Sequence, residues 1–82
     1  MRKPKLKYND KVEIKWLDAT SDSSWCNEEK VKKEVPALCF SVGYYTAQNK
    51  EAIIISPDIN SSKDRSSVVI PWGMIKKIKR LK

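Results

Sequence analysis

The sequence predicts a small, mainly β domain in which five antiparallel strands form a barrel. Apolar and polar residues alternate with a period of two in several segments, and no long segment follows the 3.6-residue period of an amphipathic helix. Turn-forming residues separate these segments, and a proline interrupts the chain shortly before the last one. Because 82 residues provide only one modest core, we expect a single barrel whose last strand pairs with its first.

The first two predicted strands enclose a long first loop. Residues 11–17 alternate apolar and charged side chains, which predicts a half-buried strand. Residues 38–46 predict a second strand, which carries Leu38, Phe40, Val42 and Tyr44 on one face and Cys39, Ser41, Gly43 and Tyr45 on the other. Between the two strands, Asn27 followed by two glutamates is typical of a helix start, and Pro36 ends the segment. A helix over residues 28–35 would depend on packing, so the sequence leaves this segment open between helix and loop.

Three further strands complete the predicted barrel. A turn at residues 47–50 leads into a β-branched strand over residues 51–56, which Pro57 ends because proline cannot donate to a ladder. Residues 66–70 predict a fourth strand and residues 74–81 a fifth, with a tight break at residues 71–73. We expect one core that contains seven side chains from these strands: Val12, Ile14, Phe40, Val42, Ile54, Val69 and Ile78.

Two parts of the sequence resemble known small proteins. Val68-Val-Ile-Pro-Trp-Gly-Met-Ile-Lys76 is similar to the end of SH3-type barrels, where a strand, a single turn that begins at proline and a short final strand follow one another. Together with Val12-Glu-Ile-Lys-Trp-Leu-Asp18, Trp25 and Ser41-Val-Gly-Tyr-Tyr45, it resembles small uncharacterised proteins encoded by phages and prophages. The resemblance implies a five-stranded SH3-like β-barrel over residues 8–82, after a basic extension over residues 1–7. Since the acidic opening motif and paired tryptophans of peptide-binding SH3 domains are missing, proline-peptide binding is not implied.

Aromatic residues predict the main function, which is a non-catalytic interaction module that binds a protein partner. Trp25 lies in a polar loop, Tyr45 on the strand face opposite Tyr44, and Trp72 directly after Pro71. These three rings are harder to bury than the other aromatic side chains, and exposed aromatic rings often anchor protein interfaces. The alternative for the same three residues is burial as loop anchors.

The distribution of charge predicts an alternative function, nucleic-acid binding. The formal net charge is +7, yet nine of the 17 Lys and Arg residues lie in the first and last seven positions, and all ten Asp and Glu residues lie between them. Basic ends of this kind contact a phosphate backbone without a fixed geometry. The other interpretation is a solvated edge that prevents aggregation. The candidate residues are Arg2, Lys3, Lys5, Lys7, Lys76, Lys77, Lys79 and Arg80.

Composition argues against several other classes of protein. The chain has no histidine, only two glycines and no nucleophile motif, so we expect neither an enzyme nor a bound cofactor. Two cysteines without histidine are too few for a structural zinc site, and we expect them to be reduced thiols. No segment approaches the roughly 20 apolar residues of a membrane span, and no signal peptide is visible. We therefore expect a cytoplasmic protein with no membrane partner, and the oligomeric state stays open.

Overall fold

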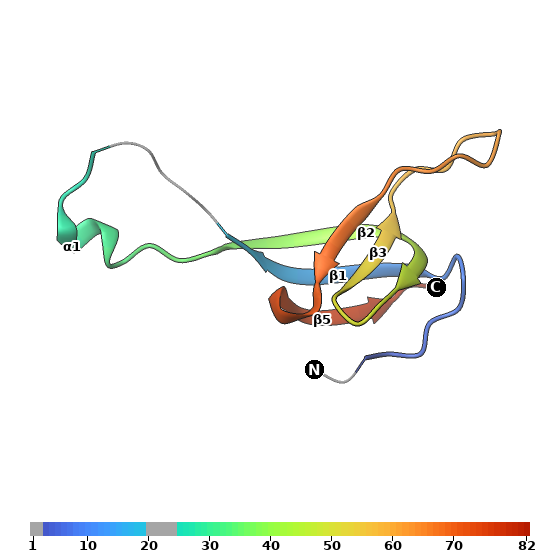
Figure 1. The fold of residues 1–82 in the computed structure, drawn as a ribbon, viewed down its shortest axis with the longest axis horizontal. Helices are drawn as coiled ribbons and strands as arrows, with labels where there is room; N and C mark the ends of the chain where they lie inside the picture. The colour runs from blue at the N-terminus through green and yellow to red at the C-terminus, as the bar shows by residue number, and fades with distance from the viewer. Residues whose placement is uncertain (1–2, 20–24) are drawn as a thin grey trace.

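Five antiparallel strands form one open sheet in the computed structural model, which describes residues 3–19 and 25–82. The strands are β1 (Lys11–Asp18), β2 (Ala37–Gln48), β3 (Ala52–Ser56), β4 (Val68–Pro71) and β5 (Ile75–Arg80), in the spatial order β4-β3-β2-β1-β5 (Figure 1). The predicted mainly β, antiparallel architecture is confirmed, and so is the pairing of the last strand with the first. The expected closure into a barrel is not seen, because within the described residues β4 and β5 end the strand order without pairing with each other.

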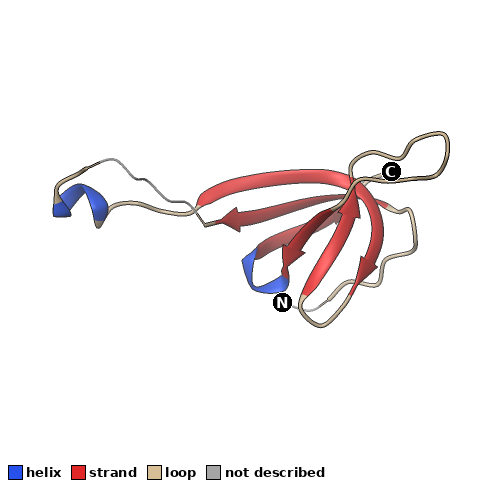
Figure 2. Cartoon of the chain, turned by 45° about the horizontal axis from the view of Figure 1, so that its top comes forward, coloured by secondary structure: helices blue, strands red, loops and turns tan. Residues whose placement is uncertain are grey.

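The long strand β2 serves both halves of the sheet. Residues 37–44 pair with β1, and residues 44–48 pair with β3, where the register shifts between Tyr45 and Ala47. β3 and β4 thereby fold back over one side of the half formed by β2, β1 and β5, as the curved strands in Figure 2 show. At this crossing, a Cβ atom added to Gly43 would lie 3.0 Å from the backbone carbon and oxygen of Ser56. The crossing therefore requires glycine for steric reasons, since the φ angle of Gly43 is not positive.

The hydrophobic core lies between the two halves of the sheet. It consists of six buried aliphatic residues from four strands: Val12, Ile14, Ile53, Ile55, Ile70 and Ile75. On β2, the residues opposite Val12 and Ile14 are Gly43 and Ser41, so small residues line the core-facing side of this strand. The Trp16 indole donates a hydrogen bond to the Ser41 hydroxyl on this side, with a donor–acceptor distance of 3.0 Å.

Three side chains expected in the core point to solvent instead. Phe40, Val42 and Val69 are 60%, 51% and 58% exposed, so this part of the core prediction is wrong. The two predicted β1 residues are buried as expected, while Ile54 and Ile78 are half-buried. The physical reason is the crossing described above. Because β3 and β4 cover the small-residue side of β2, the large apolar side chains of that strand remain on its other side.

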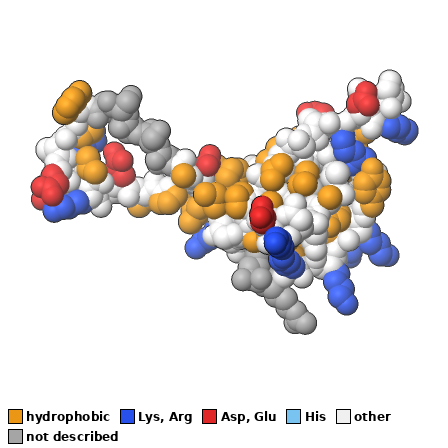
Figure 3. Space-filling view, in the orientation of Figure 1, with side chains coloured by type: hydrophobic (Ala, Val, Ile, Leu, Met, Phe, Trp, Pro, Cys, Tyr) orange, Lys and Arg blue, Asp and Glu red, His pale blue; other side chains and the backbone are white. Residues whose placement is uncertain are grey.

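Residues 25–36, which precede β2, project from the sheet, and we call them the arm (Figure 1). Its helix α1 (Glu28–Val31) is a single turn, in which the Asn27 side chain accepts a hydrogen bond from the Lys30 amide at 2.9 Å. None of the α1 residues is buried, and Trp25 is 102% exposed. Figure 3 shows apolar and charged side chains on the surface of the arm, apart from the body. The segment that the sequence left open is helical only over its first four residues, since no packing supports a longer helix.

Arg65 in the β3–β4 loop holds the segment before β1 against the sheet. The carbon of its guanidinium lies 4.8 Å from the centre of the Tyr8 ring. Its Nη1 donates hydrogen bonds to Asn9 Oδ1 at 3.0 Å and to Thr46 Oγ1 at 3.1 Å. Nearer the N-terminus, Leu6 is partly buried against the core. The Arg65 guanidinium thus connects the β3–β4 loop with the segment before β1 and with β2.

Candidate binding face

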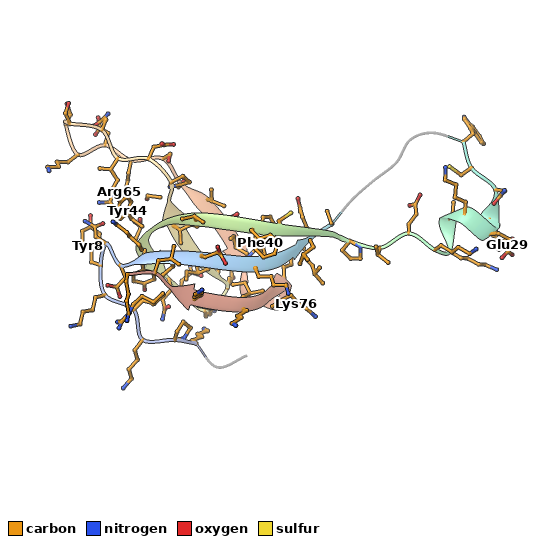
Figure 4. All side chains as sticks on the ribbon, turned by 180° about the vertical axis from the view of Figure 1, so that it is seen from behind. Tyr8, Glu29, Phe40, Tyr44, Arg65 and Lys76 are labelled. Atoms are coloured by element: carbon orange, nitrogen blue, oxygen red, sulfur yellow. The ribbon has the colours of Figure 1, made fainter. Side chains whose placement is uncertain are left out.

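The best candidate for a functional site is the outer face, which we define as the side of β1, β2 and β5 that points away from the core. On β2 this face carries the Phe40 row: Leu38, Phe40 and Val42. Leu38 and Val42 are each 51% exposed, and Phe40 lies over the β1–β2 pair in the view from behind (Figure 4). The cross-strand register places one β1 residue beside each member of the row: Leu17, Lys15 and Glu13.

Lysine side chains stand next to Phe40 on the same face. The ladder between β1 and β5 pairs Lys15 with Lys77 and Glu13 with Lys79. These four residues and Phe40 line a shallow hollow of about 230 Å³. Three ammonium groups and one carboxylate give the hollow a net charge of +2. The arrangement can therefore hold an apolar group against the Phe40 ring and an anionic group beside it.

The three predicted protein-binding residues do not share one groove. Trp72 begins the one-turn 3-10 helix η1 (Trp72–Met74), and its Nε1 donates a hydrogen bond to the Asn49 carbonyl at 2.8 Å. The ring of Trp72 also packs against the core, with Lys3 Nζ 5.1 Å from the ring centre. Tyr45 packs partly buried against the same core. Only Trp25 is fully exposed, and it lies on the arm. The geometry of Trp72 and Tyr45 fits the loop-anchor alternative.

The pairing of β1 with β5 places the basic last strand beside the strand that follows the N-terminal segment. The described members of the predicted set are all exposed: Lys3, Lys5, Lys7, Lys76, Lys77, Lys79 and Arg80. Arg2 lies outside the described residues. Lys77 and Lys79 are on the outer face, whereas Arg80 pairs with a core-facing residue of β1 and lies 3.9 Å from the Asp10 carboxylate. The basic set is therefore divided by the pleat of β5 rather than gathered on one face.

Reasoning from the sequence missed the Phe40 row and Lys15. Phe40 and Val42 were assigned to the core because their side chains are large and apolar. A signal was present in the alternate positions, where Cys39, Ser41 and Gly43 are small. A strand face made only of small residues fits the close passage of another backbone, which leaves the larger side chains outside. Lys15 was part of the polar face of β1 and could be placed beside Phe40 only by the register.

The described residues contain no group of three or more His, Cys, Asp or Glu side chains that could hold a metal ion. Neither of the helices found in residues 3–19 and 25–82 has the length and apolar character needed to cross a membrane. Comparisons of the chain with protein-family models, with curated proteins and with solved structures gave no match. The outer face itself, with the Phe40 row and its neighbouring lysines, therefore provides the evidence for function.

Proposed function

We propose that this chain is a non-catalytic interaction module of the SH3-like barrel type that binds a protein partner through the Phe40 row. The observation that carries the proposal is the exposure of three large apolar side chains side by side on one strand. Contiguous apolar surface that the fold does not need for its own core marks a binding site in many proteins. The ring of Phe40 also fits the enrichment of aromatic residues in protein interfaces.

The order of the strands supports the SH3-like part of the proposal. β1 lies between β2 and β5, β2 takes part in both halves of the sheet, and η1 connects β4 to β5. The succession of β4, η1 and β5 is the one that the resemblance of residues 68–76 implied. A phage or prophage origin and a cytoplasmic location belong to the same proposal and rest on the sequence.

The test is capture of a protein from a nuclease-treated bacterial lysate by the immobilised chain. We expect the wild type and a Val69→Ala control to retain the same protein, and Phe40→Ala to lose it. Val69 is a suitable control because it is equally exposed but lies on β4, outside the Phe40 row. Capture that is identical for all three chains, or that disappears after nuclease treatment, would contradict the proposal.

A second candidate function, nucleic-acid binding, is favoured by the three lysines around Phe40. A base could stack on the ring while the lysines contact phosphates. We rank this candidate lower because two of the three side chains in the row are aliphatic and offer no stacking platform. Three lysine contacts to a single strand predict a slope of log affinity against log salt of about −2. Replacing Lys15, Lys77 and Lys79 with glutamine should remove that slope. If a single-stranded oligonucleotide does not bind the wild type at about 50 mM salt, this candidate is rejected.

A further inference from the structure

The edge of β2 beside the Phe40 row has no partner strand among the described residues. β3 begins to pair with β2 only at Tyr44, so residues 37–43 have a neighbour on the β1 side alone. The Tyr45 amide and carbonyl bond to Asp10 and Asn9, which precede β1. Successive residues of a strand direct their backbone groups to opposite edges. The three residues of the Phe40 row therefore direct their amides and carbonyls toward the open edge.

This edge lacks the protection that the other two edges of the sheet have. β4 is only four residues long and ends at Pro71. β5 carries Lys or Arg at four of its six positions. Residues 37–43 contain neither a charged residue nor a proline. Because short length, proline and lysine are the usual means of preventing unwanted strand pairing, the β2 edge is the one that this chain leaves available.

We propose that an extended, acidic segment of a partner protein adds to this edge as a sixth strand. The inference rests on the proposed function and specifies the chemistry of the partner. Main-chain hydrogen bonds to the Phe40 row would supply affinity. Every second side chain of the added strand lies on the outer face. We expect these outer-face positions to carry both apolar residues, which pack beside the row, and acidic residues, which face the lysines of the hollow. The net charge of +2 in the neighbouring hollow selects acidic segments by attracting them and repelling basic ones.

A second copy of this chain fits the edge less well than an acidic segment. Two copies paired through β2 would place two outer faces side by side, each with Lys15, Lys77 and Lys79 against a single carboxylate. Like charges gathered on one continuous sheet oppose that assembly. A nucleic acid has no peptide backbone with which to continue the ladder.

The test uses three capped synthetic peptides with threonine at every second position; the positions between carry leucine and, in turn, glutamate, glutamine or lysine. Leucine and the variable residue then lie on the same face of the added strand. Single-stranded oligo(dT) is the fourth ligand. Binding is followed through the backbone amide signals of the 15N-labelled full chain, which also detects millimolar affinities. We expect the glutamate peptide to shift the amides of residues 38, 40 and 42 and to bind about tenfold more tightly than the glutamine peptide at low salt. Lys15→Gln should weaken the glutamate peptide severalfold, whereas Lys33→Gln on the arm removes the same charge without effect.

N-methylation of the peptide distinguishes strand addition from simple contact. Methyl groups on every second amide block one edge of an extended peptide and leave the other edge intact. We expect one of the two methylated forms of the glutamate peptide to lose at least tenfold in affinity and the other to bind normally. The comparison requires no change in the protein, so it cannot be confused with a folding defect. Phe40→Ala should weaken every form that binds.

The outcomes separate this inference from the proposed function. If both methylated forms bind equally, if the glutamine peptide binds as well as the glutamate peptide, or if no peptide binds, the inference is wrong. The proposed function then survives provided that capture from lysate still depends on Phe40. If oligo(dT) shifts the same amides while no peptide does and Phe40→Ala leaves capture unchanged, both are wrong.

Discussion

Replacing Gly43 with alanine tests whether the crossing of β3 over β2 shapes the fold. The new Cβ atom would lie 3.0 Å from the carbonyl carbon and oxygen of Ser56 and 3.1 Å from the nitrogen of Pro57, all of which are backbone atoms. Carbon atoms pack best at about 3.5–4.0 Å, so the end of β3 must move outward by roughly half an ångström. Overpacking of this kind costs about 1–3 kcal/mol. The reduced freedom of the unfolded alanine chain offsets about 0.4–1 kcal/mol, and the middle of these ranges corresponds to a net loss of about 1–2 kcal/mol.

Urea and thermal unfolding, followed by tryptophan fluorescence, measure this loss. A domain of this size has a total stability of about 4–12 kcal/mol, and each kcal/mol corresponds to about 4–8 °C in Tm. We therefore expect Gly43→Ala to lower Tm by about 5–15 °C. Gly73→Ala is the matched control, because apart from Gly73 and its two chain neighbours no residue has an atom within 4 Å of the added Cβ, and the φ angle of Gly73 is not positive. Equal stability of the two variants would refute the close crossing of β3 and β2.

Three further predictions concern side chains on the surface of the sheet, in the β3–β4 loop and on the arm. Phe40→Ala is expected to lower the free energy of unfolding by less than about 1 kcal/mol because the ring is 60% exposed, whereas Ile55→Ala in the core should lower it by about 2–5 kcal/mol. Equal losses of the two variants in urea unfolding would show that the Phe40 side of β2 faces the core. Arg65→Lys keeps the charge but loses the two Nη1 hydrogen bonds, so the free energy of unfolding should fall by about 1–2 kcal/mol and Tm with it. An unchanged Tm would contradict the anchoring of the N-terminal segment. Trp25→Ala should leave Tm unchanged because the ring is fully exposed; a loss of partner capture in this stable variant would extend the binding surface to the arm.

The candidate site shows where reasoning from the sequence stops. Alternation along β1 correctly indicated that the charged residues, Lys15 among them, lie on the polar side of that strand. The sequence could not show that the three lysines of the hollow lie beside Phe40, because that proximity depends on the registers of two separate ladders. Trp72, which was predicted to bind a partner, is instead anchored within the fold. Its indole finds a backbone carbonyl at Asn49, which is distant in the sequence and becomes a neighbour only in the folded chain.

Local patterns in the sequence were sufficient for the strands themselves. Period-two alternation, the β-branched run before Pro57 and the break at Pro71 give five strands, and polar cap chemistry gives the start of α1 at Asn27. The same patterns could not decide which side of β2 or β3 is buried, since neither strand has a charged face. Tertiary structure decided which side of each strand is buried. β3 passes within contact distance of Gly43, so the side of β2 with small residues faces the core, and the large apolar side chains remain in solvent as the Phe40 row.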